Sequence, residues 1–429
     1  MICLEASPAP IQSGCACRSD AGLAHIVCLV RAAESQAAHR GSEGWWRCST
    51  CKQNFTGEVE IGLAKEWWSR VRHQQADSAD RLDAASNLAN ALHSVGKYAE
   101  AEQMQRELLS AQQRMLGAEH PRTLTNKANL AVSLYSQGKY AEAEQMQREL
   151  LNAQHRILGS EHPRTLIAKV HLATCLYGQG KYAEAAQMER ELLDVQHRML
   201  GAEHPDTLRT RSNLAASLNG QGQYDKAEKL WHELLDVQRR VLGAEHPDTL
   251  RVTGHLAIST NRQGRYAEAE QIERELLDAQ RRVLGPEHPD TLFTTSNLAA
   301  SLNGQGRYVE AERMERELLD AQRRVLGAEH PDTLRTRHHL AVSLNGQGRY
   351  VEAEQCWQEL LDVQQRVLGA EHPETLRTTS NLSAFNDPPP TVTSAPVDAA
   401  SDDCTLLPTA VPDVLLGRLH TWRPSPSPW

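Results

Sequence analysis

A set of motifs recurs every 42 residues through most of the chain, and this period constrains the fold more than any other feature. The Gly-x-Tyr motif occurs at Tyr98, Tyr140, Tyr182, Tyr224, Tyr266, Tyr308 and Tyr350. The Leu-Gly-x-Glu-His-Pro motif ends at Pro121, Pro163, Pro205, Pro247, Pro289, Pro331 and Pro373. No insertion or deletion breaks this register. Such a period predicts one small unit stacked on its copies, because a single unit cannot bury its apolar face alone.

Each unit has the pattern of two helices. In the fourth unit, apolar residues follow helical spacing over 208–218 and again over 224–242. Gly243 then suits a left-handed helix stop, and His246 precedes a Pro-Asp pair that favours the first turn of the next helix. We interpret the recurring His as a cap or turn residue, because copies this far apart along a solenoid cannot converge on one metal ion. The pattern predicts an all-α superhelix of about seven helix pairs.

The block from about Asp80 to Phe385 resembles tetratricopeptide repeats of the kinesin light chain type. The resemblance rests on N-L-A, then G-[K/R/Q]-Y-x-[E/K]-A-[E/A], then L-G-x-E-H-P-x-T-L. It implies a helical-repeat superhelix whose first helices line a groove for a protein or peptide client. The heptad coiled coil that pairs a light chain with a motor is missing from this sequence, and a cysteine cluster takes its place.

Two polar rows fall on the face that this resemblance assigns to the groove. The rows consist of Arg209, Arg251, Arg335 and Arg377, and of Asn219, Asn261, Asn303 and Asn345. Amides bond peptide backbones and guanidinium groups bond carboxylates, so we expect acidic or polar peptides as clients. Alternatively, the Asn side chains satisfy helix-terminal carbonyls and the Arg side chains form a solvated face.

Six of the nine cysteines lie within the first 51 residues. With one His they form closely spaced pairs: Cys3, Cys15, Cys17, His25, Cys28, Cys48 and Cys51. Thiolate and imidazole pairs are the ligands of structural zinc, which replaces a core that a segment this short cannot supply. The spacing therefore predicts one to two zinc ions. Cys175, Cys356 and Cys404 are expected to be ordinary thiols.

The order of these ligands resembles the RING-CH (RING variant) zinc finger, in which a His is the fifth ligand. That resemblance implies cross-bracing, with one complete site formed by Cys15, Cys17, Cys48 and Cys51. The second site would hold Cys3, His25 and Cys28 and would lack its first Cys. A start codon placed too late in the sequence and a degenerate finger with one firm site are the two explanations.

RING-type fingers hold a ubiquitin-charged conjugating enzyme, and the resemblance extends this role to three residues. Ile2 would make the apolar contact, helped by Trp46 or its neighbour Trp45, and Lys52 would stand where such ligases touch ubiquitin. For the two Trp side chains, packing over a small metal core is the alternative interpretation. The finger itself supplies no catalytic nucleophile.

The sequence predicts four regions: a finger over 1–56, a helical linker or cap over 57–79, the repeats over 80–385, and a disordered Pro-rich tail over 386–429. The formal net charge of −9 argues against nucleic acid, and no apolar run is long enough to span a membrane. We therefore expect a soluble cytoplasmic protein.

These predictions combine into a zinc-binding interaction scaffold with ubiquitin-ligase-like function, whose repeats select a protein client. The alternative is a kinesin-light-chain-like adaptor with a purely structural finger. No hydrolase constellation and no Gly-rich phosphate loop is present in the sequence.

Overall fold

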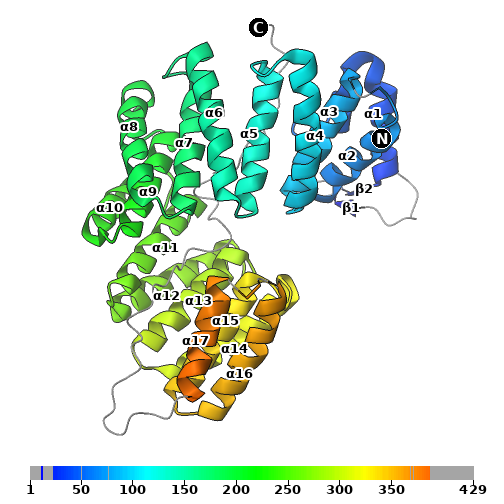
Figure 1. Cartoon of the computed structure of the whole chain (residues 1–429). Helices are drawn as coiled ribbons and strands as arrows, with labels where there is room; N and C mark the ends of the chain where they lie inside the picture. Colours follow the sequence, from blue (N-terminus) through cyan, green and yellow to red (C-terminus); the bar gives the residue numbers. More distant parts are fainter. Residues whose placement is uncertain are drawn as a thin grey trace. The chain divides into compact units, whose positions relative to one another are not determined.

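A computed structural model describes residues 11–12, 23–49, 51–75, 77–367, 369–370 and 372–386. The chain forms two compact units, and the boundary between Met188 and Glu189 falls inside helix α8. Figure 1 colours the chain along its sequence and labels the helices of both units. No described helix combines the length and apolarity that crossing a membrane would require.

Unit 1 contains the N-terminal segment and the first helix pairs. Its elements are β1 (Ile11–Gln12), β2 (Leu23–Ala24), α1 (Ile26–Arg40), η1 (Gly41–Trp45), α2 (Gly57–Val71), α3 (Ala79–Ser94), α4 (Tyr98–Leu116), α5 (Pro121–Ser136), α6 (Tyr140–Leu158), α7 (Pro163–Gly178) and the first residues of α8 (Tyr182–Leu200). The two short strands pair antiparallel, with Ile11 opposite Ala24 and Gln12 opposite Leu23.

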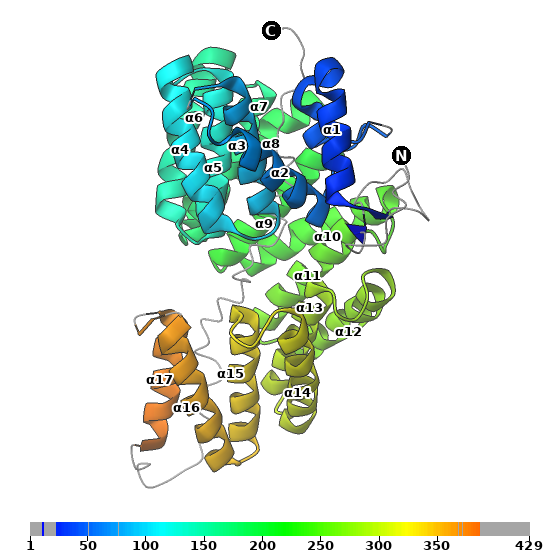
Figure 2. The same ribbon diagram turned by 90° about the vertical axis from the view of Figure 1, so that its right-hand side faces the viewer.

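Unit 2 contains the remaining pairs. Its elements are the rest of α8, α9 (Pro205–Gly220), α10 (Tyr224–Val241), α11 (Pro247–Arg262), α12 (Tyr266–Val283), α13 (Pro289–Gly304), α14 (Tyr308–Val325), α15 (Pro331–Gly346), α16 (Tyr350–Val367) and α17 (Pro373–Asn386). Successive helices such as α14, α15 and α16 pack side by side in Figures 1 and 2. The predicted all-α array of helix pairs is therefore confirmed.

The recurring motifs act as helix boundaries. His246 is the N-cap of α11, and its Nδ1 accepts a hydrogen bond of 3.2 Å from the backbone N–H of Asp248. Pro247 fills the first helical turn, where its missing N–H costs nothing. Gly243 has a φ of 99°, which a side chain at this position would disfavour. The cap interpretation of the repeated His is confirmed, and each of the described Leu-Gly-x-Glu-His-Pro motifs ends one helix and starts the next.

Small residues let neighbouring helices approach closely. The Tyr308 ring packs on Gly346 of the following first helix, where a Cβ atom would come within 2.5 Å of the ring. Ala215 and Ala227 are fully buried at the contact between α9 and α10. The Gly-x-Tyr motif thus marks a packing position between successive repeats as well as a helix start.

Helix α2 joins the N-terminal segment to the repeats. Trp67 of α2 stacks on Trp45 of η1, with ring centroids 5.8 Å apart and planes 8° from parallel. The same buried cluster contains Cys48 and Phe55 from the preceding loop and Ala84 from α3. One continuous core therefore crosses both predicted region boundaries, at 56/57 and at 79/80.

Candidate functional site

The predicted finger residues lie only partly within the described chain. Ile2, Cys3, Cys15 and Cys17 lie outside it. His25 stands directly before α1, and its carbonyl oxygen accepts hydrogen bonds from the N–H groups of Cys28 (3.0 Å) and Leu29 (3.2 Å). The first turn of α1 therefore fixes the His25–Cys28 pair at the start of a helix.

Cys48 and Cys51 occupy a tight turn between η1 and α2. The Cys48 N–H donates to the Gln53 carbonyl at 2.8 Å, and the Lys52 N–H donates to the Cys48 carbonyl at 3.1 Å. Lys52 has a φ of 61°, the left-handed conformation that lets the chain reverse directly after the second Cys. An isolated bridge between Arg47 and Asn54 closes the base of the turn.

The residue types fit zinc, because the C-x-x-C turn offers two thiolates and the separate His25–Cys28 pair offers an imidazole and a thiolate. His25 and Cys48 are both buried, which suits a metal that organises a small core. No three His, Cys, Asp or Glu side chains gather around one point among the described residues. The predicted cross-bracing would place only two described ligands in each site, so the zinc prediction stays a prediction.

Two of the predicted conjugating-enzyme contacts are described. Trp46 is half-buried at the edge of the core cluster, whereas Trp45 lies inside it beneath the Arg70 guanidinium. Lys52 is exposed, and its Nζ donates to the Ser49 carbonyl at 2.8 Å. Trp45 is thus a packing residue, while Trp46 and Lys52 retain accessible surface.

The predicted arginine row lies on the first helices of unit 2. Arg209 bonds Asp206, three residues earlier, at 2.7 Å. Arg251 pairs with Asp248 and Arg335 with Asp332 in the same way. Phe293 takes the arginine position in the repeat between them, and the Arg335 guanidinium lies over its ring at 5.6 Å. A carboxylate holds each guanidinium in place. The guanidinium groups of Arg209 and Arg251 nevertheless stay partly exposed.

The predicted asparagine row is mostly engaged inside the protein. Asn219 is buried, and Asn261 donates to Ser301 Oγ of the next repeat at 2.7 Å. Asn303 donates to Glu315 at 3.0 Å and accepts from Ser343 at 2.8 Å. Only Asn345 keeps a half-exposed side chain without such a bond. These amides join successive repeats, which neither sequence interpretation had included.

Sequence reasoning missed a column of buried residues on the second helices, one per repeat. It consists of Gln105, Gln147, Glu189, Trp231, Glu273, Glu315 and Trp357. Burial raises the pKa of Glu273 to about 8 and that of Glu315 to about 7, opposed by hydrogen bonds from Ser301 and Ser343. The repeated E-R-E-L-L motif was the available signal, because its first Glu falls on the apolar face at the same 42-residue interval.

Two half-buried histidines border the arginine row. Burial and the Arg251 charge lower the pKa of His255 to about 4. Burial, Arg377 and Arg335 lower the pKa of His339 to about 3. Both rings are therefore neutral at neutral pH, and the arginines supply the positive charge of this face. We find no nucleophile paired with a base on it among the described residues.

Solved structures similar to this chain share its helical-repeat fold. A structure described as a Podosopora anserina putative kinesin light chain with nearly identical TPR-like repeats is 27% identical, covering 48% of this chain and 98% of its own, at a TM-score of 0.42. The apo quorum sensor NprR from B. thuringiensis is 12% identical over 70% of this chain and 80% of its own, at 0.55. A Rap protein complexed with competence and sporulation factor is 10% identical over 84% and 97%, at 0.50.

No curated protein matches the sequence. Family models described as tetratricopeptide repeat match residues 80–154, 125–198, 206–282, 253–324, 290–350 and 333–374. Together these matches span more than half of the chain and contain the repeated helix pairs with their His caps. The chain belongs to the tetratricopeptide repeat family.

Proposed function

We propose that this protein is an interaction scaffold whose unit 2 binds an acidic peptide segment of a protein client. The row of Arg209, Arg251 and Arg335 carries the proposal, since the three guanidinium groups recur on equivalent first-helix positions and each is oriented by an acidic residue. A charge-assisted bond to a client carboxylate is stronger than a neutral one, and a pre-oriented guanidinium loses little entropy on binding. Asn345, with its half-exposed amide, would bond the client backbone.

The client surface is tested by binding acidic peptide arrays to the full chain. Arg251→Ala should weaken binding of the selected peptide at least tenfold while leaving the melting temperature nearly unchanged. Arg282→Ala is the matched control, because Arg282 pairs with Glu245 and is strongly exposed at 62% on a second helix. Equal losses of peptide affinity in both variants would indicate nonspecific charge attraction and would reject the arginine row as the binding surface.

We further propose that the N-terminal segment gives this scaffold ubiquitin-ligase-like function. Zinc, when bound by Cys15, Cys17, Cys48 and Cys51 and by Cys3, His25 and Cys28, would fix the loops relative to α1. Trp46 and Lys52 would then contact the charged conjugating enzyme, as the likeness to RING-CH fingers implies. The turn formed by Cys48 and the left-handed Lys52 supports this proposal.

Two measurements on the full chain test the ligase proposal. Metal analysis should find one to two zinc per chain, and Cys48→Ala should lower that number while Cys356→Ala should not. Autoubiquitination with a panel of conjugating enzymes should fall in Trp46→Ala with zinc content unchanged. A protein that holds zinc but shows no ubiquitin transfer with any enzyme would be the adaptor with a structural finger. A protein without zinc would reject the finger itself.

A further inference from the structure

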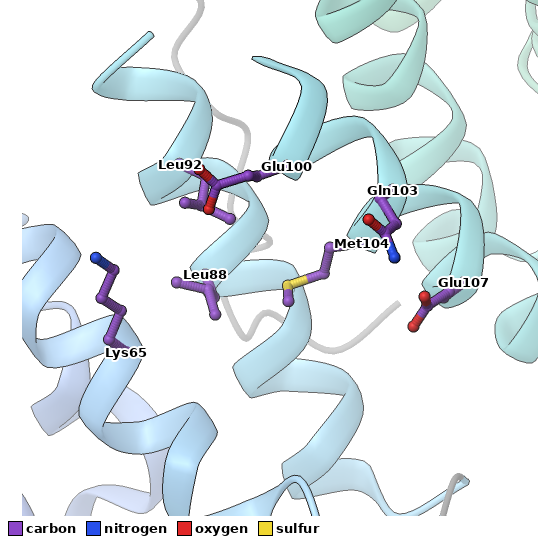
Figure 3. A pocket seen from close by; sticks show the side chains of 7 residues that line it. All are labelled: Lys65, Leu88, Leu92, Glu100, Gln103, Met104 and Glu107. Carbon is purple, nitrogen blue, oxygen red and sulfur yellow. The ribbon is translucent and has the colours of Figure 1, made fainter. Parts of the chain in front are cut away.

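A pocket of about 320 Å³ opens between α2, α3 and α4. Figure 3 shows Lys65 of α2 on one side, Leu88 and Leu92 of α3 with Met104 of α4 in the middle, and Glu107 on the other side. Glu100 and Gln103 of α4 complete its lining. The floor is apolar and the rim is charged, so the pocket suits a side chain with an alkyl stem and a polar head.

Helix α2 stands in the register of the second helices of the later repeats. Val59, Leu63 and Trp67 of α2 are buried, as are Ala101 and Gln105 of α4, 42 residues after Val59 and Leu63. Glu60 accepts a hydrogen bond from Ser94, the last residue of α3, and the equivalent Glu102 accepts one from Gln137, directly after α5. The same 42-residue register therefore relates α2 to α4.

The same register identifies the residue that takes the place of Ala64 one repeat later. Residue 64 is Ala, whereas its equivalent is Arg106. Arg106 bonds Glu102 through Nε at 2.9 Å and reaches across to Glu142 through Nη2 at 2.5 Å. Glu142 is the equivalent of Glu100, so an arginine crosses the groove there and ends at the carboxylate that corresponds to one rim of the pocket.

A second cation is missing from the first repeat. Lys127 of α5 pairs with Glu149 of α6, and Arg337 pairs with Glu359 in unit 2. The equivalent of this cation in α3 is Ala85, whereas the equivalent carboxylate, Glu107, is kept. Within the described part of the chain, Glu107 has no cationic partner. Glu100 pairs only with Lys97, at 2.6 Å.

We propose that this pocket binds an arginine side chain from a segment of a partner protein. The alkyl stem lies on Leu88, Leu92 and Met104, and the guanidinium bonds Glu100, as Arg106 bonds the equivalent Glu142, with Glu107 adding charge attraction. Glu107, which has no cationic partner among the described residues, and Glu100, which pairs with Lys97, supply the charge complementarity. Lys65, at the opposite rim, replaces the Glu of later repeats and limits the affinity for a cation.

The probe for the test is L-arginine amide, titrated into the full chain carrying methyl-¹³C methionine. Met104 reports on the pocket, and Met146 is its equivalent one repeat later, where Arg106 already bonds Glu142. The Met104 signal should shift saturably with L-arginine amide and at least tenfold more weakly with the neutral isostere L-citrulline amide. Met146 should not respond. An equal response to both amides, or no saturable response, overturns the proposal.

Three variants make the test specific. Arg106→Ala should open the same pocket one repeat later, so that Met146 gains a response to L-arginine amide. Lys65→Glu should tighten binding several-fold by restoring the carboxylate of later repeats. Glu107→Gln should weaken binding at least threefold without changing the melting temperature. A silent Met146 in a folded Arg106→Ala protein, or no change in Lys65→Glu and Glu107→Gln, would contradict the assignment of the pocket.

Discussion

Glu273 and Ser301 belong to successive repeats, and Ser301 Oγ donates a hydrogen bond of 2.7 Å to Glu273 Oε2 in a buried environment. Asn261 donates to the same Ser301 Oγ at 2.7 Å, so three polar side chains from neighbouring repeats form one network. The carboxyl group is thus held where ionisation is unfavourable, because the surrounding apolar helices exclude water.

Glu273 should make the stability of unit 2 depend on pH. Because its pKa is raised from 4.5 to about 8 in the folded state, the unfolding free energy falls as pH rises from 4.5 to 8. Each such carboxyl contributes a slope of about 1.4 kcal/mol per pH unit within that range. Glu273→Gln should reduce the slope, with Glu189 and Glu315 supplying the remainder because their pKa values are raised to about 8 and about 7.

The measurement is urea unfolding from pH 6.5 to 8. Within this window His255 adds no opposing slope. Because its pKa is lowered from 6.5 to about 4 in the folded state, it lowers the unfolding free energy only below pH 6.5, where the unfolded chain binds its proton. Gln is a suitable replacement, since the chain itself has Gln105 and Gln147 at this position in unit 1. Identical slopes for the two proteins would show that Glu273 ionises freely in the folded state.

The histidine caps should contribute to stability without binding metal. His246→Ala removes the 3.2 Å bond to the Asp248 N–H and should lower the unfolding free energy by about 1 kcal/mol. His246→Asn should restore most of it, because Asn is also a good N-cap residue. Both variants should keep the zinc content of the parent chain. A drop in bound zinc after His246→Ala would contradict the cap role.

Trp67 should couple the N-terminal segment to the first repeat. Trp67→Ala removes the stack on Trp45 and should cost about 3–5 kcal/mol where these elements unfold together. Hydrogen exchange should then show protection lost in both α1 and α3, because Ala84 of α3 belongs to the same core cluster. Trp231→Ala in unit 2 is the control and should leave α1 protected. Loss confined to α1 would indicate an independent finger.

Asn303 should matter to stability more than Asn345. Asn303→Ala removes a donor to Glu315 and an acceptor for Ser343, so the unfolding free energy should fall by about 1–2 kcal/mol. The equivalent second-helix position for Asn345 is Trp357 rather than a carboxylate, so Asn345→Ala should cost little. Thermal unfolding compares the two variants, and equal losses would remove the Asn303 network as the cause.

Periodicity made the helices predictable but not the polar contacts between them. The sequence of the fourth repeat predicts that α9 ends at Gly220 and α10 starts at Tyr224, because the glycines between them interrupt the helical pattern. Helix α1 is not predictable from periodicity, since its single copy shows no repeated pattern and only its cysteine spacing carries a signal. Glu315 was also missed, because sequence alone does not reveal that the Ser and Asn partners of a buried carboxyl lie on adjacent repeats.

The arginine row was predictable in position, because guanidinium groups recur at one place in the helix pattern. Its restriction to unit 2 was also visible, since Ile167 holds the position 42 residues before Arg209. The asparagine positions were predictable on the first helices, but their partners on the next repeat were not, because a row of amides does not reveal which helix it contacts. The pocket beside α2 required the structure, since only its packing showed that Ala64 stands where Arg106 does.

The left-handed glycines have a consequence for how this protein can change in evolution. Gly243 and Gly285 have φ values of 99° and 95°, and each is followed three residues later by its capping His. A single residue inserted within a helix would displace the glycine or the capping His from the turn that it must occupy. Length can therefore change without damage only by whole copies of the 42-residue unit, so the array grows and shrinks in discrete steps.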